Sequence, residues 1–190
     1  MKLTQIVAER GFAITGEVAP PKGADASGAL AEARELVRHV DAVNVTDGQG
    51  AVMRMAPIAL ARLMIEEGLV PIWQATCRDR NRIALQADLL AAEALGIENA
   101  LILTGDHMVL GDHPDAKPVF GLDSVQLLHV AARMRSGYDL AGNELSAPLH
   151  LCTGAVVAPE ADYVELQLMK LRKKLDAGAQ FIVSPGTTME

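Results

Sequence analysis

The sequence predicts an α/β fold of the TIM (β/α)8-barrel type, with about six of the eight βα units present. Three observations predict it. Short apolar runs start about 29 residues apart over the first four runs, a spacing typical of βα units. Amphipathic helical patterns separate these runs. Polar residues follow several successive runs, as they do at the C-terminal face of a barrel.

Six runs are predicted to be strands because they are nearly all apolar and rich in β-branched residues. That composition is typical of parallel strands buried on both faces of a sheet. The predicted strands are residues 13–15, 42–45, 70–73, 100–103, 149–152 and 181–183.

Five amphipathic segments between and after these strands are predicted to be helices. The first places Leu30, Ala33 and Leu36 on one face, which is the spacing of a helix that packs against a core. The predicted helices are residues 29–39, 56–66, 83–95, 124–134 and 163–175.

Two architectures fit this alternation of strands and helices, a doubly wound sheet and a TIM barrel. The fingerprint GxGxxG of dinucleotide-binding sheets is absent after the first strand. Polar side chains instead follow each of the first four strands, and this distribution favours the barrel. They are Glu17, Thr46 and Asp47, Gln74 to Thr76, and Thr104 to Asp106.

The length of the sequence predicts an incomplete barrel. A complete barrel has eight units and typically ~250 residues, whereas this sequence has 190 residues. We therefore expect residues 1–190 to form one incomplete barrel domain. Because an open sheet leaves two exposed edges, we expect either a truncated sequence or missing units that come from another chain.

The composition excludes several classes of function. A net charge of −7 and 3% aromatic residues provide no basic, aromatic surface for nucleic acid. No window approaches the ~18 apolar residues of a membrane span, and the N-terminus lacks a signal-peptide apolar block. Cys77 and Cys152 have no CxxC spacing, which predicts reduced thiols in a cytoplasmic protein. The histidines share no ligand spacing, so no metal is expected.

Two carboxylates at predicted strand ends are candidate functional groups. Glu17 in "TGEVAPP" follows the first strand, and Asp106 in "ALILTGD" follows the fourth. A carboxylate buried in mid-strand is costly, whereas one at a strand end can serve chemistry or cap a turn. Each stretch alone leaves both interpretations open.

The segment 74–82, "QATCRDRNR", places three arginines, an amide and a hydroxyl within nine residues. The arginines indicate either a phosphate-binding site or the solvated first turn of a helix, and the pattern alone favours neither. Asp79 is a candidate cap for a helix that begins near Asn81.

Five segments follow one another from about residue 12 to residue 184. They are "GEVAPPKGAD", "VNVTDGQG", "QATCRDRNRIALQADLLAAEALGIENALILTGD", "LDSVQLL" and "LRKKLDAGAQFIVS". Together, and in this order, they resemble the methylenetetrahydrofolate reductase family. The third segment is the most specific of the five.

The resemblance implies a flavin-bearing TIM barrel that uses FAD. In this family the flavin takes hydride from NADH or NADPH, or electrons from a partner. It then passes hydride to 5,10-methylenetetrahydrofolate, which gives 5-methyltetrahydrofolate. The resemblance therefore implies a cytoplasmic oxidoreductase of one-carbon and methionine metabolism, with a folate substrate, which forms a homo-oligomer or binds an electron-transfer partner subunit.

The resemblance also implies roles for individual residues. Glu17 matches the family's catalytic glutamate, which supplies a proton to the folate. Asp106 matches a catalytic aspartate that lies near the flavin and the pterin. The positions that match flavin contacts are Thr46, Gln74, Thr104, Gly105, Asp106 and Phe120.

The chain departs from the family at several positions. Many members have histidine at the position of Gln74 and some have arginine at that of Thr104, which leaves room for a phosphate contact through Arg78, Arg80 or Arg82. These three arginines all lie in segment 74–82.

A further departure concerns the end of the chain. Pro185 stands where the family usually carries a folate-contacting glutamine, and the seventh and eighth units are lacking. These features support an alternative function, a non-catalytic or accessory barrel subunit that needs a partner chain to complete its site. Another pterin-binding barrel, such as a methyltransferase domain, is less favoured because the flavin-side segments match in order.

Overall fold

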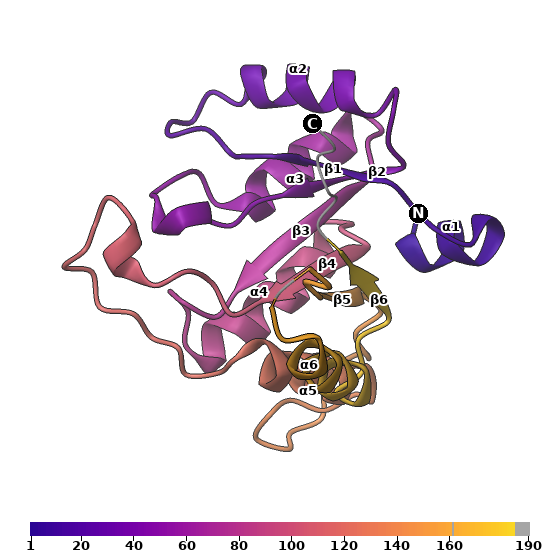
Figure 1. Ribbon diagram of the computed structural model, residues 1–190, viewed down its shortest axis with the longest axis vertical. Coiled ribbons are helices and arrows are strands. Elements are labelled where there is room, and N and C mark those ends of the chain that lie inside the picture. Colours follow the sequence, from indigo (N-terminus) through magenta and orange to yellow (C-terminus); the bar gives the residue numbers. More distant parts are fainter. Residues whose placement is uncertain (161, 185–190) are drawn as a thin grey trace.

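The computed structural model describes residues 1–160 and 162–184. Six parallel strands form one curled sheet in the order β1-β2-β3-β4-β5-β6, and helices cover its outer face (Figure 1). The strands are β1 (Thr15–Val18), β2 (Ala42–Val45), β3 (Pro71–Thr76), β4 (Asn99–Leu103), β5 (Cys152–Val156) and β6 (Phe181–Val183). The helices are α1 (Leu3–Arg10), α2 (Ser27–Leu36), α3 (Pro57–Glu66), α4 (Arg82–Ala94), α5 (Ser124–Arg135) and α6 (Val164–Asp176), with short 3-10 turns η1 (Gln49–Ala51) and η2 (Met108–Leu110).

The predicted α/β class and the alternation of strands and helices are confirmed as a six-stranded parallel half-barrel. Strand β3 begins one residue later than predicted, at Pro71, and two strands begin later by two or three residues, β1 at Thr15 and β5 at Cys152. The apolar residues before β1 and β5 bond elsewhere. The N–H of Ile14 donates to the Asp41 carboxylate at 2.8 Å, and the N–H of Leu149 donates to a carbonyl at the end of α5 at 3.0 Å. Apolar character alone does not reveal such partners.

The larger hydrophobic core lies between the outer face of the sheet and the helices. Trp73 on β3 points outward and is 1% exposed, and Met64 on α3 and Leu89 on α4 are fully buried in the same cluster. Fully burying side chains of this size contributes roughly 1.5–3 kcal/mol each. This core therefore holds the helices on the outer face of the sheet. The inner face of the sheet is not part of it.

A smaller apolar cluster fills the inner face of the sheet at the amino-terminal ends of the strands. Helix α1 covers this cluster, and the sequence analysis did not predict that helix. Leu3 and Ile6 of α1 are buried against inward-facing residues such as Ile72 and Leu101. The buried Asn99 fixes the helix, because its Oδ1 accepts from the N–H of Leu3 at 2.7 Å and its Nδ2 donates to Met1 O at 3.0 Å. The amino-terminal ends of the strands are therefore plugged.

The half-barrel has two free edges among the described residues, at β1 and β6. Between these edges lies a cavity of about 680 Å³, lined by residues of α1, β1 and β6 together with the segments next to them. Helix α6 directly precedes the edge strand β6 in the chain. It buries none of its residues, and Leu168 and Met169 are each 58% exposed. This side of the fold lacks the packing that the other helices have.

We predict that Gly154→Ala destabilises the fold by about 1–3 kcal/mol. Gly154 lies on β5, and a Cβ there would come within 2.3 Å of the Phe181 ring on the neighbouring strand β6. Urea unfolding measures the change. The matched control is Gly28→Ala in α2, where no atom lies within 4 Å of the added carbon. An unchanged unfolding midpoint for Gly154→Ala contradicts this account of the inner face.

Candidate functional site

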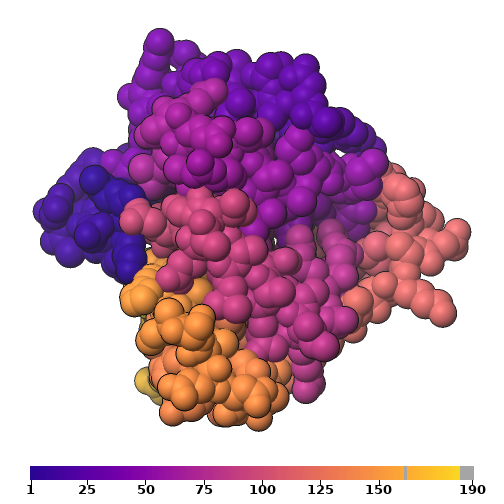
Figure 2. All heavy atoms as spheres, turned by 180° about the vertical axis from the view of Figure 1, so that it is seen from behind, coloured from indigo at the N-terminus to yellow at the C-terminus, as the bar shows by residue number. Residues whose placement is uncertain are grey.

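The carboxyl ends of the strands surround a cavity of about 400 Å³, called here the mouth. Its size lies within the range of small-molecule sites, and such sites in barrels lie at this end of the strands. Figure 2 shows α1 on one side of the molecule and the segment that follows β4 on the opposite side. The first residues of that segment, 104–106, line the mouth. The lining residues are Glu17, Asn44, Asp47, Gln49, Gln74, Thr76, Leu101, Leu103, Thr104, Gly105, Asp106, Val156 and Val183.

Glu17 lies within β1 and not after it, which corrects the predicted position. The strand runs from Thr15 to Val18, and the side chain of Glu17 is exposed in the mouth. Gln74 of β3 is 8% exposed, and its Nε2 donates to Glu17 Oε2 at 3.3 Å. An inward-facing strand position can carry a carboxylate because the mouth is open to water there.

The turn after β4 brings three further predicted residues to the mouth, Thr104, Gly105 and Asp106. Asp106 accepts a hydrogen bond from the N–H of Gly50 at 2.8 Å, so the turn is joined to η1 after β2. Gly105 has φ +96°, which favours glycine. The Thr104 hydroxyl pairs with Ser124 at the start of α5 at 3.2 Å.

Two predicted residues do not line the mouth. Thr46 is 1% exposed, and its hydroxyl has no hydrogen-bond partner within the described part of the chain. Phe120 stacks on His107 with ring centroids 6.3 Å apart. Pro185 lies outside the described residues.

A buried charge network at the wall of the mouth was missed as part of the site. Asp47 is 7% exposed and accepts from the N–H and the hydroxyl of Thr76 at 2.9 and 2.8 Å. It also pairs with Arg80 at 2.6 Å, and Arg80 continues to Asp88 on α4 at 2.8 Å. Burial acts to lower the pKa of Arg80, but the carboxylates of Asp47 and Asp88 outweigh it and the pKa is raised. The sequence marked Asp47, Thr76 and Arg80 separately, as polar residues at strand ends and as an arginine of segment 74–82, but did not indicate that they contact one another.

Of the arginines in segment 74–82, only Arg82 lies in an exposed first turn of α4, whereas Arg78 and Arg80 precede the helix and are held by carboxylates. Arg78 is 4% exposed, forms an ion pair with Asp79 at 2.8 Å and donates to Gly48 O at 3.0 Å. The prediction that Asp79 caps α4 is wrong, because Asn81 is the cap and its Oδ1 accepts from two backbone N–H groups of the first turn. The carboxylate of Asp79 instead forms the ion pair with Arg78.

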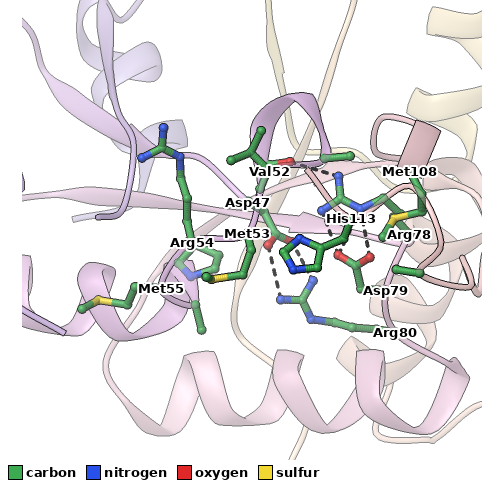
Figure 3. A pocket seen from close by; sticks show the side chains of 15 residues that line it. Asp47, Val52, Met53, Arg54, Met55, Arg78, Asp79, Arg80, Met108 and His113 are labelled. Carbon is green, nitrogen blue, oxygen red and sulfur yellow. Dashed lines mark hydrogen bonds and ion pairs between the residues drawn. The ribbon is translucent and has the colours of Figure 1, made fainter. Parts of the chain in front are cut away.

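A second cavity, of about 350 Å³, adjoins the mouth and shares Asp47 with it. Figure 3 shows Met53, Met108 and His113 around it, together with the ion pair between Asp47 and Arg80. Its walls are the segments that follow β2, β3 and β4. The loops at the carboxyl ends of β2, β3 and β4 therefore enclose a cavity.

The described residues contain no group of three or more histidine, cysteine or acidic side chains placed to hold a metal ion. Within the same residues, none of the helices combines the length and the apolar character that a membrane crossing requires.

The family model described as methylenetetrahydrofolate reductase matches residues 2–185. The chain belongs to this family. The match covers almost the whole sequence, including α1, all six strands and the mouth. No curated protein sequence matches this reductase-family chain.

Among solved structures, the chain is similar to 2,3-dimethylmalate lyase, a member of the PEP mutase/isocitrate lyase superfamily, in two crystal forms. The triclinic form gives a TM-score of 0.58 at 15% identity over 96% of this chain and 62% of that one. The trigonal form gives 0.59 at 15% identity over 100% and 63%. At this identity the similarity shows the fold alone, and the chain spans less than two thirds of the lyase.

We predict that Arg80→Met lowers the free energy of unfolding of this reductase-family chain by about 3 kcal/mol, because Asp47 keeps a buried charge without its partner. Thermal or urea unfolding measures the loss. Arg82→Met is the control, since Arg82 is exposed and its guanidinium donates to a single carbonyl, Gly121 O. Equal losses in the two variants would show that the network around Asp47 is not structural.

We also predict that neither cysteine reacts readily in the native protein. Cys77 is 0% and Cys152 1% exposed, and burial raises the pKa of Cys77 to about 12 and that of Cys152 in the same direction. Since the thiolate is the nucleophile, labelling by a thiol reagent at pH 8 should be slow until denaturant is added. Rapid labelling of the folded protein would contradict this burial.

Proposed function

We propose that residues 1–190 are a catalytic barrel domain that reduces 5,10-methylenetetrahydrofolate to 5-methyltetrahydrofolate with a bound flavin, FAD. The observation that carries the proposal is the mouth, where a chain of the methylenetetrahydrofolate reductase family brings Glu17, Gln74 and Asp106 together at the carboxyl ends of the strands. We further propose that additional βα units between β6 and β1 complete the TIM barrel.

The residues of the mouth fit a flavin and a pterin. Both rings present N–H groups and carbonyl oxygens at their edges, and the mouth offers an amide at Gln74, a hydroxyl at Thr104 and a carboxylate at Asp106. Leu101 and Leu103 supply apolar wall. When bound, FAD would supply the hydride. Gln74, Thr104 and the backbone at Gly105 would hold it, while the buried Thr46 can contribute only through its neighbours and Phe120 stacks on His107 outside the lining of the mouth.

Glu17 is proposed as the proton donor. The methylene bridge of the folate must open to an iminium before hydride can attack it, and the opening needs a proton on the departing nitrogen. Glu17 faces the mouth from β1, and Gln74 orients its carboxyl group through the 3.3 Å hydrogen bond. A ligand that fills the mouth would exclude water from the side chain of Glu17.

Asp106 is proposed to orient the ligands. Its carboxylate can accept a hydrogen bond from the amino group of the pterin while the N–H of Gly50 holds its other side at 2.8 Å. Its negative charge would also oppose the build-up of negative charge on a neighbouring ring.

The physiological setting follows from the proposed reaction. A reductant is required, either NADH or NADPH at the mouth or electrons from a partner subunit. We propose a cytoplasmic enzyme of one-carbon and methionine metabolism, acting as a homo-oligomer or with that partner.

The absorbance spectrum of the purified chain, followed by anaerobic addition of 5-methyltetrahydrofolate, tests the function. Flavin bands that bleach on addition support it, because the product would then return hydride. A colourless protein that does not take up added FAD would overturn the proposal for this chain alone.

We predict that Glu17→Gln retains flavin binding and lowers folate reduction by about 10²-fold or more, because the proton donor is lost. Anaerobic stopped-flow absorbance separates flavin reduction from folate reduction. Glu9→Gln, an exposed change on α1, serves as control. Normal folate turnover in Glu17→Gln would remove Glu17 from the mechanism.

The second candidate function is a non-catalytic or accessory subunit that needs a partner chain. The cavity of about 680 Å³ between β1 and β6 and the exposed apolar side chains of α6 favour it. Mass measurement in solution distinguishes the two candidates, since a flavin-loaded species made of this chain alone argues for self-sufficiency.

A further inference from the structure

The segments that follow β1, β2 and β4 meet at Asp112, beside the second cavity, whose lining includes Met53 and His113. Asp112 lies between β4 and α5, and its carboxylate accepts from Lys22 Nζ at 2.6 Å and from the N–H of Met53 at 3.0 Å. The ring of His113 lies at 2.9 Å from the same group. The hydrogen bonds from Lys22, His113 and Met53 hold the pKa of Asp112 well below its usual range.

Two more contacts join the segment after β4 to η1. The N–H of Gly50 donates to Asp106 at 2.8 Å. Gly111 approaches Ala51 so closely that a Cβ on Gly111 would lie 1.8 Å from the Ala51 carbonyl oxygen. Together with the bond to Asp112, residues 50, 51 and 53 therefore receive contacts from both sides of η2, from Asp106 before it and from Gly111 and Asp112 after it. In Figure 1 these two segments lie at the end of the sheet toward which the strands point.

We propose that Asp112 is a positioning residue for Asp106. Its bonds to Lys22 and Met53 fasten the segment after β4 to the segments after β1 and β2, and so keep the Asp106 carboxylate against the N–H of Gly50 at the mouth. The importance of Asp106 for ligand binding rests on the proposed function.

The coupling has a direct physical route. Gly50 lies in the turn η1 and Met53 follows two residues after its end, and within η1 both Gly50 and Ala51 have positive φ, at +65° and +56°. Such a turn persists only where its surroundings hold it. Loss of the bond to Met53 frees one end of the turn, and the contact between Gly111 and Ala51 then no longer sets the distance between Gly50 and Asp106.

Amide hydrogen exchange of the full chain without ligand tests the geometry. In Asp112→Ala the Gly50 amide should exchange about tenfold faster than in the wild type. Asp112→Asn keeps an oxygen acceptor for Met53 and should give an intermediate rate. Asp115→Ala, on the same exposed segment, should leave the rate unchanged. An unchanged Gly50 rate in Asp112→Ala overturns the proposal.

Titration with FAD tests whether the effect reaches the mouth through Asp106. Asp112→Ala should raise the dissociation constant of FAD about tenfold in the wild-type background and have no further effect in Asp106→Ala, which removes the acceptor of the Gly50 N–H. Equal effects in both backgrounds overturn the proposal, because Asp112 would then act independently of Asp106. If the wild-type chain binds no FAD, the proposed function fails, while hydrogen exchange at Gly50 still decides the positioning role.

Discussion

The alternation of side chains along six parallel strands is the constraint on which the rest of the structure depends. On β2, Val43 and Val45 enter the outer core, while Ala42 packs in the inner cluster and Asn44 lines the mouth. Because strand neighbours keep their register, as Glu17 does with Asn44, inward positions line up in layers. The layers near the amino-terminal ends of the strands are apolar and contact α1, and the layers near the carboxyl ends are polar. A shift of one residue in the register of a strand would turn its core-facing side chains into the mouth and its mouth-facing side chains into the core.

Much of this arrangement follows from local pattern. The strand 42–45 and the strand 181–183 were predicted with their observed bounds, and five helices were predicted to within a few residues. Glu17, Gln74 and Asp106 were predicted to be functional, and the fold brings all three to the mouth. Local sequence succeeds here because parallel strands place every carboxyl end at one face, so position along the chain is enough to predict position in space.

The rest depends on partners that are distant in the sequence. Asp79 looked like a helix cap, but the guanidinium of Arg78 is buried beside it and claims its carboxylate. Asp47 looked like one polar residue among many, and only the folded chain joins it to Arg80. Helix α1 is short, and its burial depends on strands that come much later. Sequence patterns do not predict such pairings, because each of these residues could pair with several other residues of the same chemical type.

The plug formed by α1 also constrains the order in which the chain can fold. Leu3 is anchored to Asn99, 96 positions further along the chain. Closing so long a loop costs entropy before any contact repays it. Although α1 precedes β4 in the sequence, it has no complete docking surface until β4 has formed. Helix α1 is therefore among the last helices to dock, and it covers the amino-terminal end of the half-barrel only after the sheet exists.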